Sequence, residues 1–89
     1  MGEKSRVLGI KNERRIARKY GKQGYQVLIV NEKGFPDLIV LKDKEIKFFV
    51  EVKTGKHSVH PFQEKVHKEI EKMGFQVRTE RLERRSPQR

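Results

Sequence analysis

The chain is 89 residues long, contains no cysteine and carries a formal net charge of +10 at pH 7. One modest hydrophobic core can form at this length, and the lack of cysteine excludes disulfides, thiolate zinc sites and thiol nucleophiles. No apolar run reaches the roughly 18 residues of a membrane span, and no signal-peptide core follows the charged N-terminus. We expect a soluble, cytoplasmic protein with one domain over residues 1–80 and a basic, flexible tail over residues 81–89.

The positive charge is concentrated at the two ends of the chain. Residues 1–25 hold eight Lys or Arg against two Glu, and residues 78–89 hold five Arg against two Glu. The middle holds nine Lys against eight acidic residues. A surface of this kind attracts polyanions, of which nucleic acid is the commonest in a cytoplasm. A salt-bridged surface of the type found in heat-adapted proteins is the alternative.

The first predicted elements are a helix and a strand. Apolar residues at helical spacing predict a helix over residues 12–22, and Leu8 or Ile10 can extend its apolar stripe toward the N-terminus. Glycines at positions 21 and 24 end this helix. The segment 25–30, YQVLIV, is apolar and rich in β-branched residues, which is typical of a buried strand.

The rest of the chain predicts three strands and a second helix. Strands are expected at residues 37–41 and 46–53, joined by a hairpin turn at KDKE. A helix with Pro61 in its first turn runs to Gly74, and a last strand covers residues 75–79. The order α-β-β-β-α-β predicts an α/β fold with a mixed central sheet flanked by helices.

Three ionisable residues stand inside the most apolar part of the chain. Side chains alternate along a strand, so Glu51 and Lys53 share one face about 7 Å apart. Counting outward from the hairpin turn brings Asp37 close to the level of Glu51 or Lys53. Two carboxylates suit a hard cation such as Mg²⁺, and a lysine beside them could activate water or stabilise charge on phosphorus. A structural ion network among the three is the alternative.

The pattern of these residues resembles a known nuclease superfamily. Pro36-Asp37, followed after 13 residues by Glu51-Val52-Lys53, resembles the PD-(D/E)XK nucleases, in which the two motifs lie on adjacent strands. The resemblance covers most of the chain and implies the restriction-endonuclease-like α-β-β-β-α-β core.

Two branches of this superfamily look similar. The segments GFPDLIV, EVKTGKHSVHPFQ and MGFQV resemble the virus-type replication–repair nuclease domain (VRR-NUC). NERRIARKYGKQGYQVL resembles archaeal Holliday junction resolvases, although NEKGFPD replaces their serine- and glycine-rich loop.

The resemblance implies a Mg²⁺- or Mn²⁺-dependent endonuclease that hydrolyses phosphodiester bonds in DNA. Lys53 would position or activate the attacking water, and Gln63 on the second helix would orient that water. A tyrosine is frequent in relatives where this chain has His67, so no role is assigned to His67. The implied metal ligands are Asp37, Glu51, Glu13 and the backbone carbonyl of Val52.

The expected partner is double-stranded or branched DNA, cut selectively at junctions or flaps in replication, repair or recombination. Because one active site cuts one strand, a two-fold homodimer is expected, and a helicase or repair protein is a further possible partner. The alternative function is a non-catalytic nucleic-acid-binding module with a nuclease-like fold. The residues expected to bind nucleic acid are Arg14, Arg15, Arg18, Lys19, Lys33, Lys56 and His57.

Overall fold

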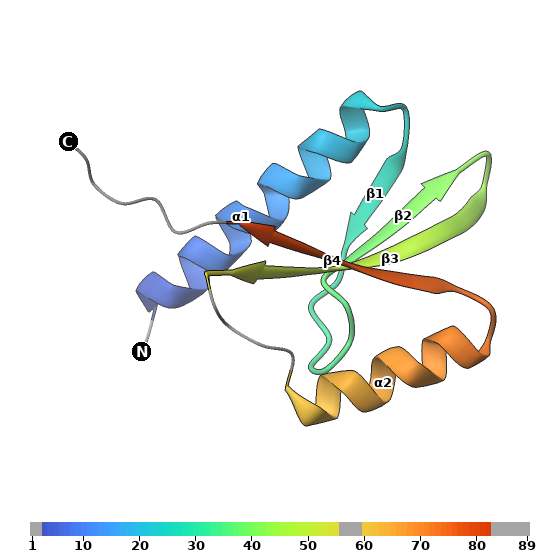
Figure 1. The fold of residues 1–89 in the computed structure, drawn as a ribbon. Coiled ribbons are helices and arrows are strands. Elements are labelled where there is room, and N and C mark those ends of the chain that lie inside the picture. The colour runs from blue at the N-terminus through green and yellow to red at the C-terminus, as the bar shows by residue number, and fades with distance from the viewer. Residues whose placement is uncertain (1–2, 56–59, 83–89) are drawn as a thin grey trace.

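The computed structural model describes residues 3–55 and 60–82 of the chain and has the predicted α-β-β-β-α-β order (Figure 1). Both helices and all four strands expected from the sequence are present, and the fold class is confirmed. Neither helix in the described part of the chain is long and apolar enough to cross a membrane. The elements are α1 (Glu3–Lys22), β1 (Gln26–Ile29), β2 (Leu38–Lys42), β3 (Glu45–Thr54), α2 (Pro61–Lys72) and β4 (Gln76–Leu82).

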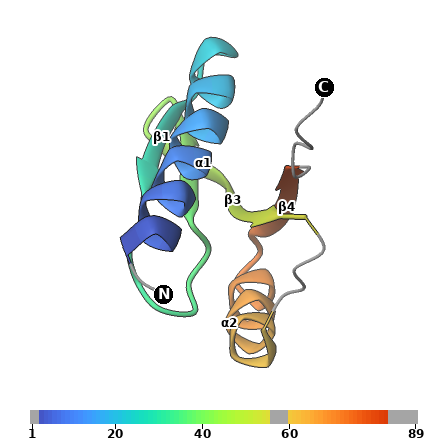
Figure 2. The same ribbon diagram turned by 90° about the vertical axis from the view of Figure 1, so that its left-hand side faces the viewer.

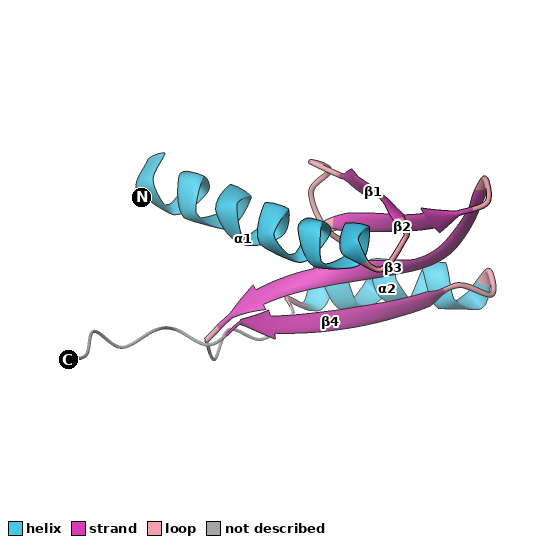
Figure 3. Ribbon diagram, turned by 90° about the horizontal axis from the view of Figure 1, so that it is seen from above, coloured by secondary structure: helices cyan, strands magenta, loops and turns pink. Residues whose placement is uncertain are grey.

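The four strands form one mixed sheet in the order β1-β2-β3-β4. The first three strands are antiparallel neighbours, and β4 is parallel to β3. A parallel pair needs a crossover connection, which α2 provides. Figure 2 shows β1 and β4 at the two outer edges, and Figures 1 and 3 show α1 and α2 on opposite sides of β3 and β4.

The alternation along β3 divides the molecule into two packed layers. Phe48 and Val50 point toward α1 and pack with Ile16 and Tyr20 in the main buried cluster. Phe49 points to the opposite face, where its ring makes edge contacts with other aromatic rings. The first layer joins α1 to the sheet, and the second layer, beside α2, also contains Glu51.

The segment predicted as a buried strand is an edge strand. β1 covers only Gln26–Ile29, and the exposed fractions of Leu28 and Ile29 are 51% and 40%. Among the described strands, only β2 pairs with β1, so the apolar composition of β1 does not lead to burial. The apolar run indicated a strand correctly, but composition alone does not distinguish a central position from an edge.

Two elements extend beyond their predicted bounds. α1 begins at Glu3, nine residues before the predicted start at Asn12. β4 continues to Leu82, three residues past the predicted end of this strand at Thr79, and Leu82 packs against the main cluster. Residues 83–89 of the predicted tail lie outside the described residues.

Candidate active site

The hairpin of β2 and β3 brings Asp37 level with Glu51. Leu38 lies opposite Val50 in the register, so Asp37, one residue earlier, lies beside the position of Glu51. The Val52 backbone N–H donates a hydrogen bond to Asp37 Oδ2, with 2.8 Å between the nitrogen and the oxygen. Of the two levels that the sequence left open, the structure therefore selects that of Glu51.

A bulge in β3 decides which face Asp37 occupies. The register shifts between Val40 and Leu41, so that β3 carries one extra residue, Lys47. With regular pairing from the same turn and no bulge, Lys47 would pair with Val40, and Asp37 would lie opposite Val50 on the face toward α1. A one-residue change of register moves a side chain to the other face of a sheet. The bulge therefore places Asp37 and Glu51 on the same face.

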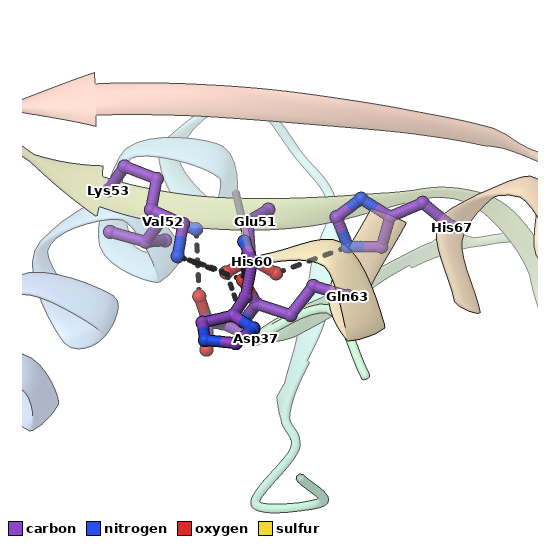
Figure 4. A network of polar contacts seen from close by, with 7 residues as sticks. All are labelled: Asp37, Glu51, Val52, Lys53, His60, Gln63 and His67. Carbon is purple, nitrogen blue, oxygen red and sulfur yellow. Dashed lines mark hydrogen bonds and ion pairs between the residues drawn. The ribbon is translucent and has the colours of Figure 1, made fainter. Parts of the chain in front are cut away.

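Glu51 lies at the centre of a polar network (Figure 4). Its side chain is buried, with 1% of its surface exposed. Lys53 Nζ lies 3.4 Å from Glu51 Oε2, and Gln63 Nε2 donates to the same oxygen at 3.2 Å. The predicted meeting of Asp37, Glu51 and Lys53 is confirmed as geometry, and α2 brings Gln63 to them.

Gln63 connects the lysine to the start of α2. Its Oε1 accepts hydrogen bonds from Lys53 Nζ and from the backbone N–H of His60, each at 3.1 Å. The second bond satisfies a free N–H at the helix N-terminus. The amide is therefore oriented from both sides, with its NH₂ toward Glu51.

His67 is the residue of this network that sequence reasoning left without a role. It lies one turn after Gln63 on α2, its exposed fraction is 9%, and its Nε2 is 3.3 Å from Glu51 Oε1. Residues four apart share a helix face, so the spacing from Gln63 was a usable signal.

The carboxyl groups of Glu13, Asp37 and Glu51 lie close enough together to interact electrostatically. Burial first, and then the Asp37 carboxyl, raise the pKa of Glu13 from its ordinary 4.5 to about 7. Burial first, and then the charge of Asp37, raise the pKa of Glu51 to about 7, against the opposing effect of Lys53. Glu13 on α1 is thus a third carboxyl group near Asp37.

Stability should depend on pH mainly through these two groups, whose shifts are the largest, while the lowered pKa of His67 opposes them in part. Their folded-state pKa values lie above the ordinary value, so their contribution is fully present below about pH 4.5 and is lost as pH rises through about 7. We expect the free energy of unfolding in EDTA to fall by about 2–4 kcal/mol between pH 5 and pH 8. Urea denaturation at a series of pH values measures it, and a constant or rising value would contradict the pKa assignments.

The donor set fits a hard divalent cation. Asp37 and Glu51 offer carboxylate oxygens, and the raised pKa values of Glu13 and Glu51 indicate negative charge that Lys53 alone does not neutralise. Among the described residues, no three His, Asp or Glu side chains are placed to hold a metal ion by themselves. A partial set of protein ligands suits Mg²⁺, which keeps several of its waters.

The residues expected to contact nucleic acid are distributed over separate parts of the surface. Arg14, Arg15 and Arg18 are exposed on α1, and Lys33 is exposed in the loop before Asp37. Lys19 is also exposed but pairs with Glu80 of β4 at 3.0 Å. Lys56 and His57 lie outside the described residues.

Gly34 lies in the loop before Asp37, at the point where this loop contacts the start of α2. Its φ is +80°, and a Cβ built on it would lie 2.3 Å from a ring carbon of Phe62, the neighbour of Gln63. A side chain here would be strained by the backbone and would also push the ring away. The Phe62 ring, whose exposed fraction is 53%, would have to turn away for the loop to keep its position.

Gly34→Ala should destabilise the fold by about 2–5 kcal/mol, because the positive φ and the clash with Phe62 add. Gly74→Ala is the matched control, since Gly74 also has a positive φ, +98°, but has no atom within 4 Å of an added Cβ. Urea denaturation of both variants, and of Gly34→Ala combined with Phe62→Ala, measures the difference. Equal losses in the two single variants would show that the ring contact is unimportant.

Comparison with known proteins identifies one family. A family model described as the VRR-NUC domain matches residues 7–81 of the chain. No curated protein and no solved structure gives a significant match. The matched range includes every described residue of the polar network around Glu51.

Proposed function

The chain belongs to the VRR-NUC domain family, a family of nuclease domains, and on this premise we propose that it is a metal-dependent DNA endonuclease. The observation that carries the proposal is the buried Glu51 carboxylate, held beside Asp37 and Lys53 at one end of the hairpin. A buried carboxylate is costly unless it is compensated, and Lys53 compensates only part of the local negative charge. A site for a cation and a phosphate explains why the residues stand together.

Asp37 and Glu51 are the proposed metal ligands, with Mg²⁺ or Mn²⁺ as the ion. When bound, the ion supplies positive charge that polarises a phosphate oxygen and promotes ionisation of water. Within a strand, the N–H and C=O of one residue face the same neighbour. Since the Val52 N–H faces Asp37, its carbonyl is directed to the same side and is the proposed third ligand. Glu13 would bind the ion or its water shell through the carboxyl that faces Asp37.

Lys53 and Gln63 are proposed to position the attacking water, and Lys53 also to activate it. The Lys53 ammonium is held between Glu51 Oε2 and Gln63 Oε1, at 3.4 and 3.1 Å. From there it can hydrogen-bond a water or stabilise the charge that develops on the phosphate oxygens. Gln63 fixes the direction of the ammonium and can also orient the water.

DNA is the proposed substrate, cut selectively at junctions or flaps in replication, repair or recombination. The net charge of +10 supports binding to the phosphate backbone, which attracts basic surfaces irrespective of base sequence. Arg14, Arg15 and Arg18 are exposed on α1, and Lys33 is exposed in the loop that precedes Asp37. Contacts to the phosphate backbone of DNA, rather than to its bases, suit recognition of DNA shape.

A two-fold homodimer is the proposed assembly, since cutting both strands needs two active sites. Leu28 of β1 and Ile46 of β3 are exposed apolar residues. Each lies opposite an apolar residue of β2, Ile39 and Leu41 respectively, and these two share the sheet face opposite α1. Exposed apolar patches of this kind mark interaction surfaces. Sedimentation at micromolar concentration should show a dimer that Leu28→Lys converts to monomer, with Lys47→Met as the surface control. A monomeric parent chain would contradict the assembly.

A combined cleavage and metal-binding assay tests the proposed function. Protein with Mg²⁺ or Mn²⁺ should cut linear, flapped or four-way-junction DNA, and EDTA should stop the reaction. Asp37→Ala should lose cleavage and bind Mn²⁺ at least about tenfold more weakly, while retaining affinity for DNA. If the parent chain cuts none of these substrates and Asp37→Ala leaves Mn²⁺ affinity unchanged, the chain is instead a non-catalytic binding module.

A further inference from the structure

The contact between His67 and Glu51 is the least explained part of the network (Figure 4). His67 Nε2 and Glu51 Oε1 face each other at 3.3 Å, and both atoms are buried. Neither atom makes a hydrogen bond of ordinary geometry to any described residue, so the two face each other without a formed bond. A buried polar atom without a partner costs about 1–3 kcal/mol, so two such atoms in mutual contact are expected to satisfy each other.

The two oxygens of Glu51 have different surroundings. Oε2 lies beside Gln63 Nε2 and Lys53 Nζ. These are the residues proposed to position the attacking water. Oε1 lies against His67. Gln63 and His67 come from consecutive turns of α2, so one rigid helix face contacts both oxygens of the carboxylate.

The chemistry of the contact indicates which atom is the donor. A neutral imidazole carries one N–H, on either ring nitrogen, and an imidazolium carries an N–H on both. An ionised carboxylate accepts hydrogen bonds and cannot donate them. If Glu51 is ionised, as a metal ligand must be, Nε2 has to carry a proton for this contact to be a hydrogen bond.

We propose that His67 is a positioning residue that donates its Nε2–H to Glu51 Oε1 and thereby turns Oε2 toward the metal and the attacking water. The proposal deepens the nuclease function and rests on it for the role of Oε2. His67 itself touches neither the substrate nor the metal. The hydrogen bond restricts rotation of the Glu51 carboxylate before the metal binds. Metal binding therefore does not have to restrict that rotation itself, and the affinity for the metal is higher.

A matched pair of variants tests the donor. Glutamine and methionine have similar length, but only glutamine carries an N–H at the reach of histidine Nε2. His67→Met should weaken Mn²⁺ binding about 10- to 100-fold, whereas His67→Gln should recover most of that loss. Lys68→Met is the control for a methionine at an exposed position of the same helix. Calorimetric titration with Mn²⁺ gives the affinities, and circular dichroism confirms folding. Equal loss in both His67 variants, or unchanged affinity in His67→Met, would overturn the proposal.

The tautomer of the histidine is a second test that needs neither metal nor cleavage. Long-range ¹H–¹⁵N NMR of the metal-free parent chain at pH 8 should show the His67 proton on Nε2. A proton on Nδ1 would mean that Glu51 is the donor, and it would overturn the proposal even if the enzyme cuts DNA. A parent chain that binds no Mn²⁺ would instead refute the nuclease function, while the Nε2 tautomer would still agree with His67 as the donor.

Discussion

Glu51→Gln is expected to abolish DNA cleavage and to make the metal-free protein more stable at pH 8. The substitution removes a proposed metal ligand, which should lower the cleavage rate by at least about 10³-fold. The glutamine also resembles the protonated carboxyl group. Burial stabilises this neutral form of Glu51 relative to the ionised form, which raises the pKa of Glu51 to about 7. The amide therefore relieves the cost of an ionised group, and the free energy of unfolding should rise by about 1–3 kcal/mol.

The opposite directions of the two effects make this variant informative. Glu45→Gln is the control, because Glu45 lies on the same strand but is exposed and pairs only with Lys47 among the described contacts. It should change neither quantity by a measurable amount. Urea denaturation in EDTA at pH 8 and a cleavage assay with Mg²⁺ give the two results. A Glu51→Gln protein that is less stable than the parent would show that the carboxylate serves structure rather than a site.

Lys53→Met is expected to stop cleavage without preventing metal binding. The ammonium is held 3.4 Å from Glu51 Oε2, where it can act on a water or on the phosphate. Loss of such a group should lower the rate constant by about 10²- to 10⁴-fold. A positive charge beside the metal ligands repels a cation, so its removal should leave Mn²⁺ affinity unchanged or increase it.

The control for this variant is Lys47→Met, at the bulge of the same strand and exposed to solvent. Single-turnover cleavage with saturating Mn²⁺ separates the chemical step from metal binding. If Lys53→Met cuts DNA at the parent rate, the lysine is part of an ion network only. If the variant loses both metal binding and cleavage, its role is to hold Glu51 in place.

The sequence by itself determined the elements and the main chemical groups. Apolar alternation over residues 46–53 is a local property, and it placed Glu51 and Lys53 on one face without knowledge of the fold. The turn residues between β2 and β3 likewise identified the hairpin that carries Asp37 to them. These predictions succeeded because each depends on neighbours along the chain.

Tertiary structure decided the features that depend on contacts between distant segments. The bulge at Lys47 sets the register that puts Asp37 on the Glu51 face, and local composition does not encode such a shift. The exposure of β1 follows from its place at the sheet edge, and the contact of His67 with Glu51 follows from how α2 packs on β3. Periodicity indicates which residues share a face of one element, whereas only packing between elements decides what that face meets.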